Sequence, residues 1–499
     1  MTVRFISRSD ALNGLLPCAG YLTESIQSNE GKAQAMLSVL PAYLEKGEVD
    51  LAAELANTVE DHFVRDRLLI NVAEKCASIG DEDYAMQLAD AIDDPAMRAQ
   101  AHETIGLKLA SLEKFDAAQT LADSMEHRDN LLAGIAVQQH LSGASDAAKL
   151  TMAEIGYPPA ATQAYLAIAA GEIDSDDHAA AVQHLEEALV RSEEIEHEEE
   201  RIRTVIDVGN SFAAAGRNDR AIETLDSAKE LAERLDNVHR DNFLSSISIG
   251  LFRAGSIDLA DRTLDLVADK TQIANALLGF SREYWKKNER EDALDALEES
   301  NAILRSQTEK ETRDSRVRYT LLQNIAVQFA GFERGERAIE LAQSIDHEEP
   351  SMNALAQIAN ILIYQKDAES ARTALNAIAE DAQRAFALTA MADTVSGEND
   401  PETAADLLDE ALALAEEVPQ LPSRATVYSG LSTRFFRLGH ADKALEAATA
   451  ALDTAAAIKD ESGRVAALAE LAGVFEANGF ELNERHKEVI QQMLQPGQF

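Results

Sequence analysis

The sequence predicts an all-α protein built from stacked helix pairs, and three observations support this fold class. A short motif, a glycine followed by four residues and then an alanine, recurs along the chain. The segments between its copies place apolar residues at helical spacing. Apolar residues make up 46% of the 499 residues, but aromatic residues only 5%, so the core relies on the small and aliphatic side chains that suit closely packed helices.

The motif defines a repeated unit. We use its final alanine as the anchor of each unit. Complete copies run from "GEVDLA" through "GDEDYA", "GASDAA", "GRNDRA" and "GSIDLA" to "GHADKA", with anchors Ala52, Ala85, Ala148, Ala221, Ala260 and Ala444. Copies without the glycine have anchors at Ala118, Ala180, Ala293, Ala338, Ala371 and Ala404. Successive anchors are 30 to 45 residues apart, a period that indicates stacked supersecondary units.

Each unit is predicted to contain two helices joined by a tight turn. The second unit has one apolar-periodic stretch over 65–79 and another over 82–92, with Gly80 between them. We expect Gly80 to end the first helix in a left-handed conformation, and the acids after it to favour the start of the second. The anchor alanine lets the two helices cross closely. Prolines mark the ends of several units, at Pro95, Pro158, Pro159, Pro350 and Pro422.

The repeats also predict the domain organisation. Residues 1–31 form an N-terminal cap segment, residues 32–480 the solenoid, and residues 481–499 a C-terminal capping helix and tail. Units of about 33 residues extend to about residue 157, and units of about 33 and 40 residues are mixed after it.

The units resemble the tetratricopeptide repeat (TPR) family. In Val205–Leu231 the residues Gly209, Phe212, Leu225 and Ala228 lie at the family's offsets from Ala221. Phe435 and Ala451 repeat two of these offsets around Ala444, and Pro350 falls twelve residues after Ala338, where the family often has a closing proline. The resemblance implies a right-handed superhelix, an α-solenoid of about 12–13 helix-turn-helix units, whose first helices line a concave groove that holds peptides or partner helices.

The composition restricts the class of partner. With 45 basic against 88 acidic residues the net charge is −43, which disfavours nucleic acids and anionic membranes and favours basic partners or cations. Scarce lysine and many acids are also typical of a protein from a high-salt cytosol, and that hypothesis predicts loss of helical signal in low salt. An acidic protein of ordinary origin is the alternative. No run approaches the roughly 18 apolar residues of a spanning helix, so we expect no membrane insertion and a cytoplasmic location.

A search for catalytic and metal-binding patterns leads to the expectation of a protein that is not an enzyme. Cys18 and Cys76 form no disulfide framework or zinc spacing, and "LLPCAG" around Cys18 departs from a lipoprotein processing site. "GFERGER" lacks the end of a phosphate loop, and "EEIEHEEER" around His197 is interpreted as a solvated face. His178 and His184 lie six residues apart, off a common helix face. We therefore expect no catalytic residue, metal or cofactor.

The groove that the resemblance implies can be projected onto residues 18, 15, 11 and 8 before each anchor. This projection is not acidic, and it is rich in asparagine, which can pair with a peptide backbone through both its donor and its acceptor. Trp285, the only tryptophan, is proposed to form an anchoring pocket with Phe252 and Arg282. Space filling between units is the alternative for Trp285. The predicted partner-binding residues are Arg203, Asn210, Asn242, Ser245, Phe252, Asn275, Arg282, Trp285, Gln323, Asn353 and Asn360.

The leading functional hypothesis is a scaffold that binds a protein or peptide in this groove. One alternative is a regulatory sensor, in which a peptide or small ligand changes the superhelix. Another is an accessory subunit of a larger assembly.

Overall fold

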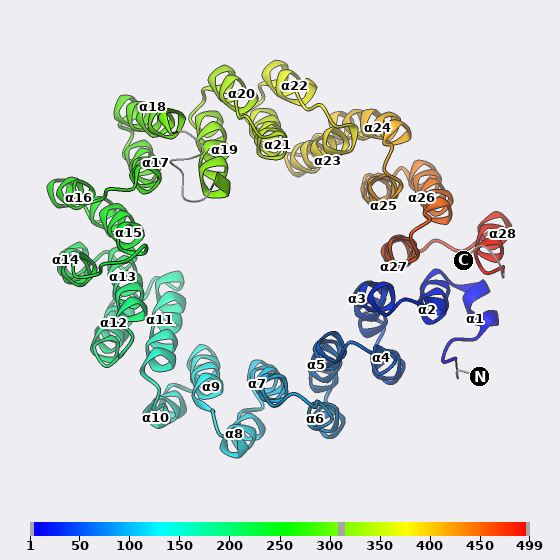
Figure 1. Cartoon of the computed structure of the whole chain (residues 1–499), viewed down its shortest axis with the longest axis horizontal. Helices are drawn as coiled ribbons and strands as arrows, with labels where there is room; N and C mark the ends of the chain where they lie inside the picture. Colours follow the sequence, from blue (N-terminus) through cyan, green and yellow to red (C-terminus); the bar gives the residue numbers. More distant parts are fainter. Residues whose placement is uncertain (1–3, 308–314, 496–499) are drawn as a thin grey trace. The chain divides into compact units, whose positions relative to one another are not determined.

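The computed structural model describes residues 4–307 and 315–495, and within these ranges every regular element is a helix (Figure 1). The chain divides into two compact units, unit 1 (residues 1–101 and 335–499) and unit 2 (residues 102–334). The helices that start in the first part of unit 1 are α1 (Arg8–Asn13), α2 (Leu15–Ser25), α3 (Asn29–Glu45), α4 (Val49–Ala56), α5 (His62–Ile79), α6 (Glu82–Asp90) and α7 (Pro95–Ser111).

Helix α7 continues into unit 2. The further helices of that unit are α8 (Phe115–Ser124), α9 (Asp129–Leu141), α10 (Ser145–Glu154), α11 (Pro158–Asp174), α12 (His178–Ser192), α13 (Glu198–Ala214), α14 (Asn218–Glu233), α15 (Arg240–Arg253), α16 (Ile257–Leu264), α17 (Lys270–Lys286), α18 (Arg290–Ser306) and α19 (Ser315–Gly331). Unit 1 resumes with α20 (Gly335–Gln343), α21 (Glu348–Tyr364), α22 (Ala368–Asn376), α23 (Asp381–Gly397), α24 (Pro401–Glu417), α25 (Leu421–Arg437), α26 (Ala441–Ala457), α27 (Glu461–Ala477) and α28 (Glu484–Met493).

From α3 to α26 the helices form twelve pairs, and each predicted anchor lies at the start of the second helix of a pair. Within each unit the first helices of the pairs lie side by side and the second helices form a layer behind them (Figure 1). This is the architecture of a TPR-like α-solenoid, so the predicted fold class is confirmed.

The turn inside each pair explains why half of the motifs can lack glycine. All twelve pairs have a residue with positive φ before the second helix. Six of these residues are glycines, including Gly80 with φ 90°, which confirms its predicted left-handed conformation. The other six are polar residues such as Asn288 and Asn399, which can enter this region at a modest energetic cost. The turn therefore persists where the sequence motif fades.

One predicted anchor is wrong by one residue. In the pair α11–α12 the left-handed residue is Asp176, and the side chain of Asp177 caps α12 by accepting a hydrogen bond from the Ala180 amide at 3.1 Å. The fifth residue after the left-handed position is consequently Ala181, which is fully buried, whereas Ala180 is half-buried. Ala181 is the structural anchor of this pair, and offsets below are counted from it.

In unit 2 the core lies between the two helices of a pair and continues into the next pair. In unit 2 a cluster of aliphatic and aromatic side chains joins α13, α14, α15, α16 and α17. It includes Phe252 and Phe280, whose stacked rings have centroids 4.3 Å apart. The anchors Ala221 and Ala260 are fully buried, as close helix crossing requires. Within unit 2, the neighbouring pairs from α13 to α17 therefore share one continuous core.

In unit 1 the two ends of the chain pack against one another. Helix α27 contacts both α2 and α3, and α28 contacts α1. At this junction Lys46 Nζ lies 3.1 Å from Glu476 Oε2. Cys18 is fully buried in α2, and burial raises the pKa of its thiol to about 12. The N-terminal segment is thus part of a helical core shared with the last helices of the chain.

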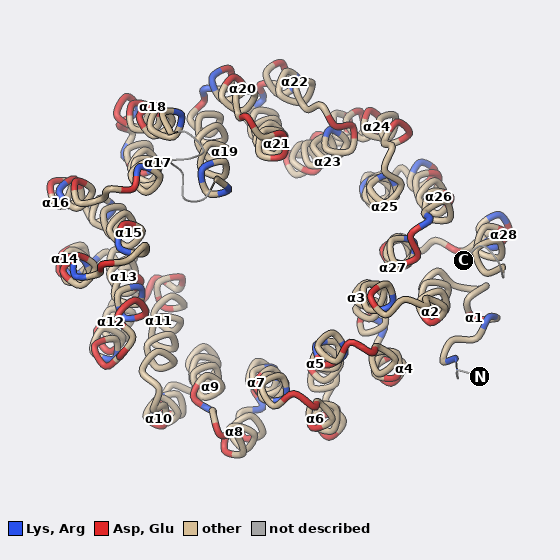
Figure 2. Tube along the Cα trace, viewed as in Figure 1, with Lys and Arg blue, Asp and Glu red and all other residues tan. Residues whose placement is uncertain are grey.

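Acidic residues are unevenly distributed between the two layers (Figure 2). Helix α18 carries five acidic residues and its partner α17 one, and α24 carries six against two in α23. Helix α25 has no acidic residue and three arginines. In these pairs the first helices carry much less of the negative charge than the second helices.

Candidate functional site

The first helices carry a row of polar side chains at one repeat position. We call the residues 18 before each anchor the polar row. None of the twelve is acidic, although the chain has 88 acidic residues, and nine are Gln, Asn or Thr. Nine of the twelve are exposed and three are half-buried. The members are Gln34, Arg67, Gln100, Asn353, Phe386 and Thr426 in unit 1, and Asn130, Gln163, Arg203, Asn242, Asn275 and Thr320 in unit 2.

The structure separates the predicted partner-binding residues by accessibility. Arg203 and Asn242 are exposed on α13 and α15. Ser245 and Phe252 are fully buried in unit 2, where the Ser245 hydroxyl donates to the Gln272 carbonyl oxygen at 2.8 Å. The remaining predicted amides at offsets 18 and 15, which are Asn275, Gln323 and Asn353, are half-buried.

Residues at offset 11 contact the next first helix. In unit 2 Arg282 Nε donates to Gln328 Oε1 at 2.8 Å, joining α17 to α19. Asn210 Oδ1 is buried against Gly250 of α15, so closely that a Cβ atom at position 250 would lie only 2.8 Å from it. Among the described residues this oxygen has no hydrogen-bond partner. The bond of Arg282 therefore links two neighbouring first helices, whereas Asn210 only packs against α15.

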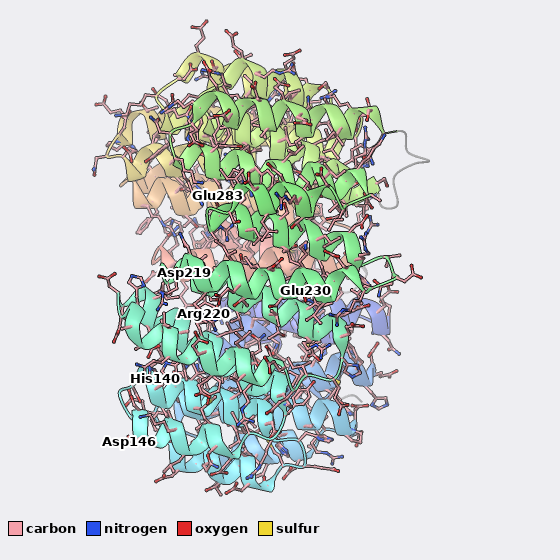
Figure 3. All side chains as sticks on the ribbon, turned by 90° about the vertical axis from the view of Figure 1, so that its left-hand side faces the viewer. His140, Asp146, Asp219, Arg220, Glu230 and Glu283 are labelled. Atoms are coloured by element: carbon pink, nitrogen blue, oxygen red, sulfur yellow. The ribbon has the colours of Figure 1, made fainter. Side chains whose placement is uncertain are left out.

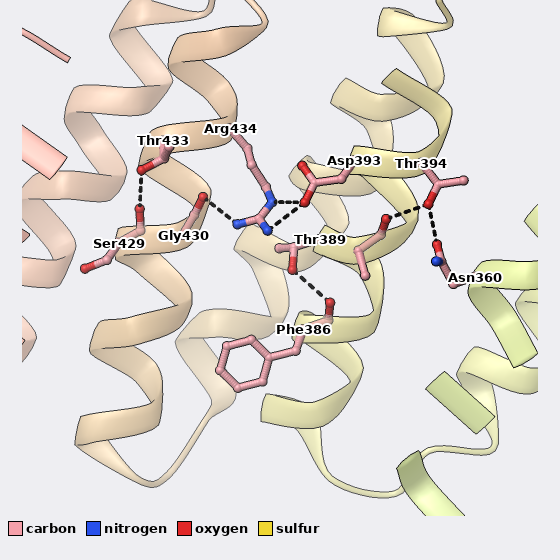
Figure 4. Close-up of polar contacts among 10 residues, drawn as sticks. Asn360, Phe386, Thr389, Asp393, Thr394, Ser429, Gly430, Thr433 and Arg434 are labelled. Atoms are coloured by element: carbon pink, nitrogen blue, oxygen red, sulfur yellow. Dashed lines mark hydrogen bonds and ion pairs between the residues drawn. The ribbon is translucent and has the colours of Figure 1, made fainter. Parts of the chain in front are cut away.

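The same contact occurs in unit 1, as Figure 4 shows. Thr394 Oγ1 donates to Asn360 Oδ1 at 2.7 Å between α21 and α23. Arg434 on α25 donates to Asp393 Oδ2 on α23 through Nε at 2.9 Å and Nη2 at 2.7 Å. Polar bonds therefore connect three successive first helices, and Asn360 is engaged within the protein.

Trp285 is held in an intramolecular stack within unit 2. Its ring lies almost parallel to that of Phe332, with centroids 4.2 Å apart, and the Arg290 guanidinium lies 4.3 Å from its centroid. Arg290 also lies 3.3 Å from Glu333. Stacking and cation–π contacts of this kind stabilise neighbouring pairs. Trp285 is half-buried, and the buried Phe252 lies in the hydrophobic core.

Members of the polar row outside the predicted set include Gln34, Arg67, Gln100, Asn130 and Gln163. Four of these five follow from applying the offset of 18 to anchors that the sequence already identifies. Gln163 follows only after the anchor is corrected to Ala181, because the uncorrected anchor points to the buried Thr162.

A second polar cluster lies between α9, α11 and α12 in unit 2. His140 Nε2 lies 3.0 Å from Glu172 Oε1, and His184 Nδ1 lies 2.8 Å from Glu172 Oε2. In the described part of the chain, this is the one group of His, Cys, Asp and Glu close enough to hold a metal ion. Sequence spacing did not reveal it, because its three residues come from three helices. Figure 3 labels His140 on the side of unit 2 where the first helices end.

Comparisons with known proteins return distant similarities to solved structures. No protein-family model matches the chain, and no curated protein matches it. Among solved structures, Ton1535 from Thermococcus onnurineus NA1 is 16% identical, with a TM-score of 0.25, over 71% of this chain and 98% of its own. The apo form of the quorum sensor NprR from B. thuringiensis is 14% identical, with a TM-score of 0.27, over 72% and 99%. The apo form of RapI is 11% identical, with a TM-score of 0.31, over 69% and 96%.

Identities and TM-scores this low establish no function shared with these proteins. Across the described ranges, no helix combines the length and the apolar character that crossing a membrane requires.

Proposed function

We propose that the protein is a non-enzymatic scaffold that binds an extended segment of a partner protein or peptide along its first helices. The observation that carries this proposal is the polar row, which is exposed at nine of its twelve positions and free of acids in a strongly acidic protein. Twelve independent positions avoid negative charge while the second helices accumulate it, as α18 and α24 do.

The chemistry of the row suits a peptide backbone. Asparagine and glutamine each offer a donor and an acceptor, so their amides can pair with peptide N–H and C=O groups whatever the peptide sequence. Seven of the twelve pairs provide such an amide at this position, so amides recur along the first helices as an extended peptide would need. Arg203 adds a donor for a peptide carbonyl or carboxylate. The net charge of −43 favours a basic partner through long-range attraction.

The test is selection of peptides from a displayed random library on the full-length protein, followed by affinity measurement with a selected peptide. The double change Arg203→Ala and Asn242→Ala removes two row residues from α13 and α15. We expect the dissociation constant to rise by about 10-fold or more, because each lost hydrogen bond contributes about 1 kcal/mol.

The matched control is Ser227→Ala with Arg262→Ala. These two exposed residues lie on α14 and α16, the second helices of the same two pairs. The control removes one arginine and one neutral polar side chain, as the row variant does. Equal losses in the two variants, or no loss in the row variant while its helical signal is intact, would contradict binding at the row.

A further inference from the structure

The polar cluster of unit 2 occupies positions that other pairs reserve for the core. Glu172 lies nine residues before its anchor, where ten of the other eleven pairs have an apolar, aromatic or cysteine side chain. The exception is Gln139 in the adjacent pair. His184 lies three residues after the anchor, where every other pair has Leu, Ala or Thr. His140 lies eight residues before Ala148, where the other pairs have apolar side chains or, once, serine.

Charged or polar side chains at these core positions lower the stability of the fold unless other groups compensate for their burial. Glu172 is only 9% exposed, and burying a carboxylate requires a positive charge and hydrogen bonds in compensation. Its two oxygens face two imidazole nitrogens, and in the described part of the chain no lysine or arginine lies within ion-pair distance of them. A proton on one histidine, or a cation held between the three side chains, can supply the positive charge.

The arrangement of the cluster matches a metal centre. The three ligand atoms all lie within 4.8 Å of one another, and they belong to two imidazoles and one carboxylate. Zinc is bound at about 2.0–2.2 Å by these groups, so ligand atoms about 3 Å apart can approach one ion with small side-chain movements. Helices α9, α11 and α12 hold the ligands, and the His140 and His184 rings meet edge to face with centroids 5.2 Å apart.

The cluster also borders open space. His140, Glu172 and His184 line a cavity of about 560 Å³ together with Lys149, Met152 and Tyr165. The Tyr165 ring lies at 26° to that of His184, with centroids 6.1 Å apart, which restricts the orientation of this imidazole. Three protein ligands leave at least one coordination position for water or another ligand.

We propose that His140 Nε2, Glu172 and His184 Nδ1 bind one divalent transition-metal ion of the zinc class between α9, α11 and α12. Imidazole ligands favour zinc and its neighbours in the first transition row over magnesium and calcium, which prefer oxygen ligands. The site joins two consecutive helix pairs, so the bound ion links α9 to α11 and α12. This inference is independent of peptide binding at the polar row.

The test uses the full-length protein, freed of metal with a chelator and titrated calorimetrically with zinc chloride alone. Excess magnesium is present throughout, because it occupies the many surface carboxylates without competing for imidazoles. We expect one zinc ion per chain. Cobalt chloride provides a second readout, since a four- or five-coordinate cobalt site with imidazole ligands has strong visible absorption.

Two variants remove the ligands in different ways. The triple change is His140→Ala, Glu172→Leu and His184→Leu. It introduces the residues that other pairs have at the equivalent positions, namely Ala77, Leu109 and Leu121, and all three of these are buried. We expect zinc affinity to fall by roughly 100-fold or more, since even outer-shell changes cost 10- to 100-fold. Glu172→Gln keeps the shape of the side chain but removes its charge, and should weaken zinc binding as well.

The matched control is His178→Ala. His178 lies on the same helix as His184, but its ring is exposed and pairs with Asp176 at 3.1 Å. This variant should bind zinc and cobalt as the unchanged protein does. Absence of zinc binding in the unchanged protein would overturn the proposal in favour of a protonated histidine beside Glu172. Equal binding by the triple variant, with its helical signal intact, would also overturn it.

Discussion

Glu172 and Glu283 are two glutamates of unit 2 that are buried in the last turn of a first helix, yet their neighbours differ in chemistry. Glu283 on α17 lies 3.2 Å from Arg253 and 2.9 Å from Lys286, two cations that stay charged at all ordinary pH values. Glu172 on α11 lies between two histidines, which carry a charge only when protonated. Figure 3 labels Glu283 and His140 at the same end of the helices.

The neighbouring side chains decide whether each glutamate can take part in binding a metal ion. Arg253 and Lys286 are permanent counter-charges, and a protonated lysine or arginine has no lone pair for a metal ion. Glu283 is therefore part of a structural ion pair between α15 and α17. Imidazoles can bind a metal ion when they are neutral, so the buried carboxylate of Glu172 and its two histidines can bind one together.

The largest expected effect is the stabilisation of the protein when zinc binds at Glu172. At a zinc concentration 100-fold above the dissociation constant, binding should raise the free energy of unfolding by about 2.7 kcal/mol, because the ion binds only the folded site. Thermal unfolding followed by circular dichroism measures this. A Glu283→Gln variant should show the same zinc-induced increase in the free energy of unfolding. Loss of this increase in that variant would contradict the assignment of the zinc site to Glu172 alone of the two glutamates.

The next effect concerns the ion pair of Glu283. We expect Glu283→Gln to lower the free energy of unfolding at pH 7 by about 1.5 kcal/mol in urea titrations. Charge-assisted hydrogen bonds contribute more than neutral ones, but the exposure of Arg253 and Lys286 reduces their contribution.

This effect should depend on pH. Burial by itself would raise the pKa of Glu283, but hydrogen bonds from Lys286 and Arg253 outweigh it and hold the pKa below its usual value. Because the folded-state pKa is lower than the unfolded value of about 4.3, the stabilisation is present above that pH. It is lost as the pH falls through the folded-state pKa. The variant and the unchanged protein should therefore converge in acid, and a constant difference at every pH would argue against an ion pair.

The smallest effect concerns Glu172 in metal-free protein. The triple change His140→Ala, Glu172→Leu and His184→Leu should raise the free energy of unfolding by about 1 kcal/mol, since replacing buried charged groups by packed apolar ones is often stabilising. Urea titration in the presence of a chelator checks this. A large destabilisation would mean that the cluster stabilises the fold without metal, as Glu283 does with its cations.

Much of the fold could be predicted from the sequence because it rests on local rules. Gly80 and its equivalents mark the turns, and the fully buried anchors such as Ala85 mark the helix crossings. The register failed only at Ala180, where no glycine marks the turn and Asp176 takes the left-handed conformation instead. The candidate site was predicted less completely. The offset rule identified the exposed Arg203 and Asn242, but it also selected Phe252, which packs into the core.

The helix pairs, the turns and the absence of acids from the polar row follow from the sequence, because each depends on residues close together in the chain. Which side chains meet across pairs depends on the packing of the whole fold. His140 and Glu172 are 32 residues apart, and they face each other because α9 packs beside α11. The junction of α2 and α3 with α27 likewise joins residues from opposite ends of the chain. Such contacts depend on how pairs stack, and no local periodicity encodes that packing.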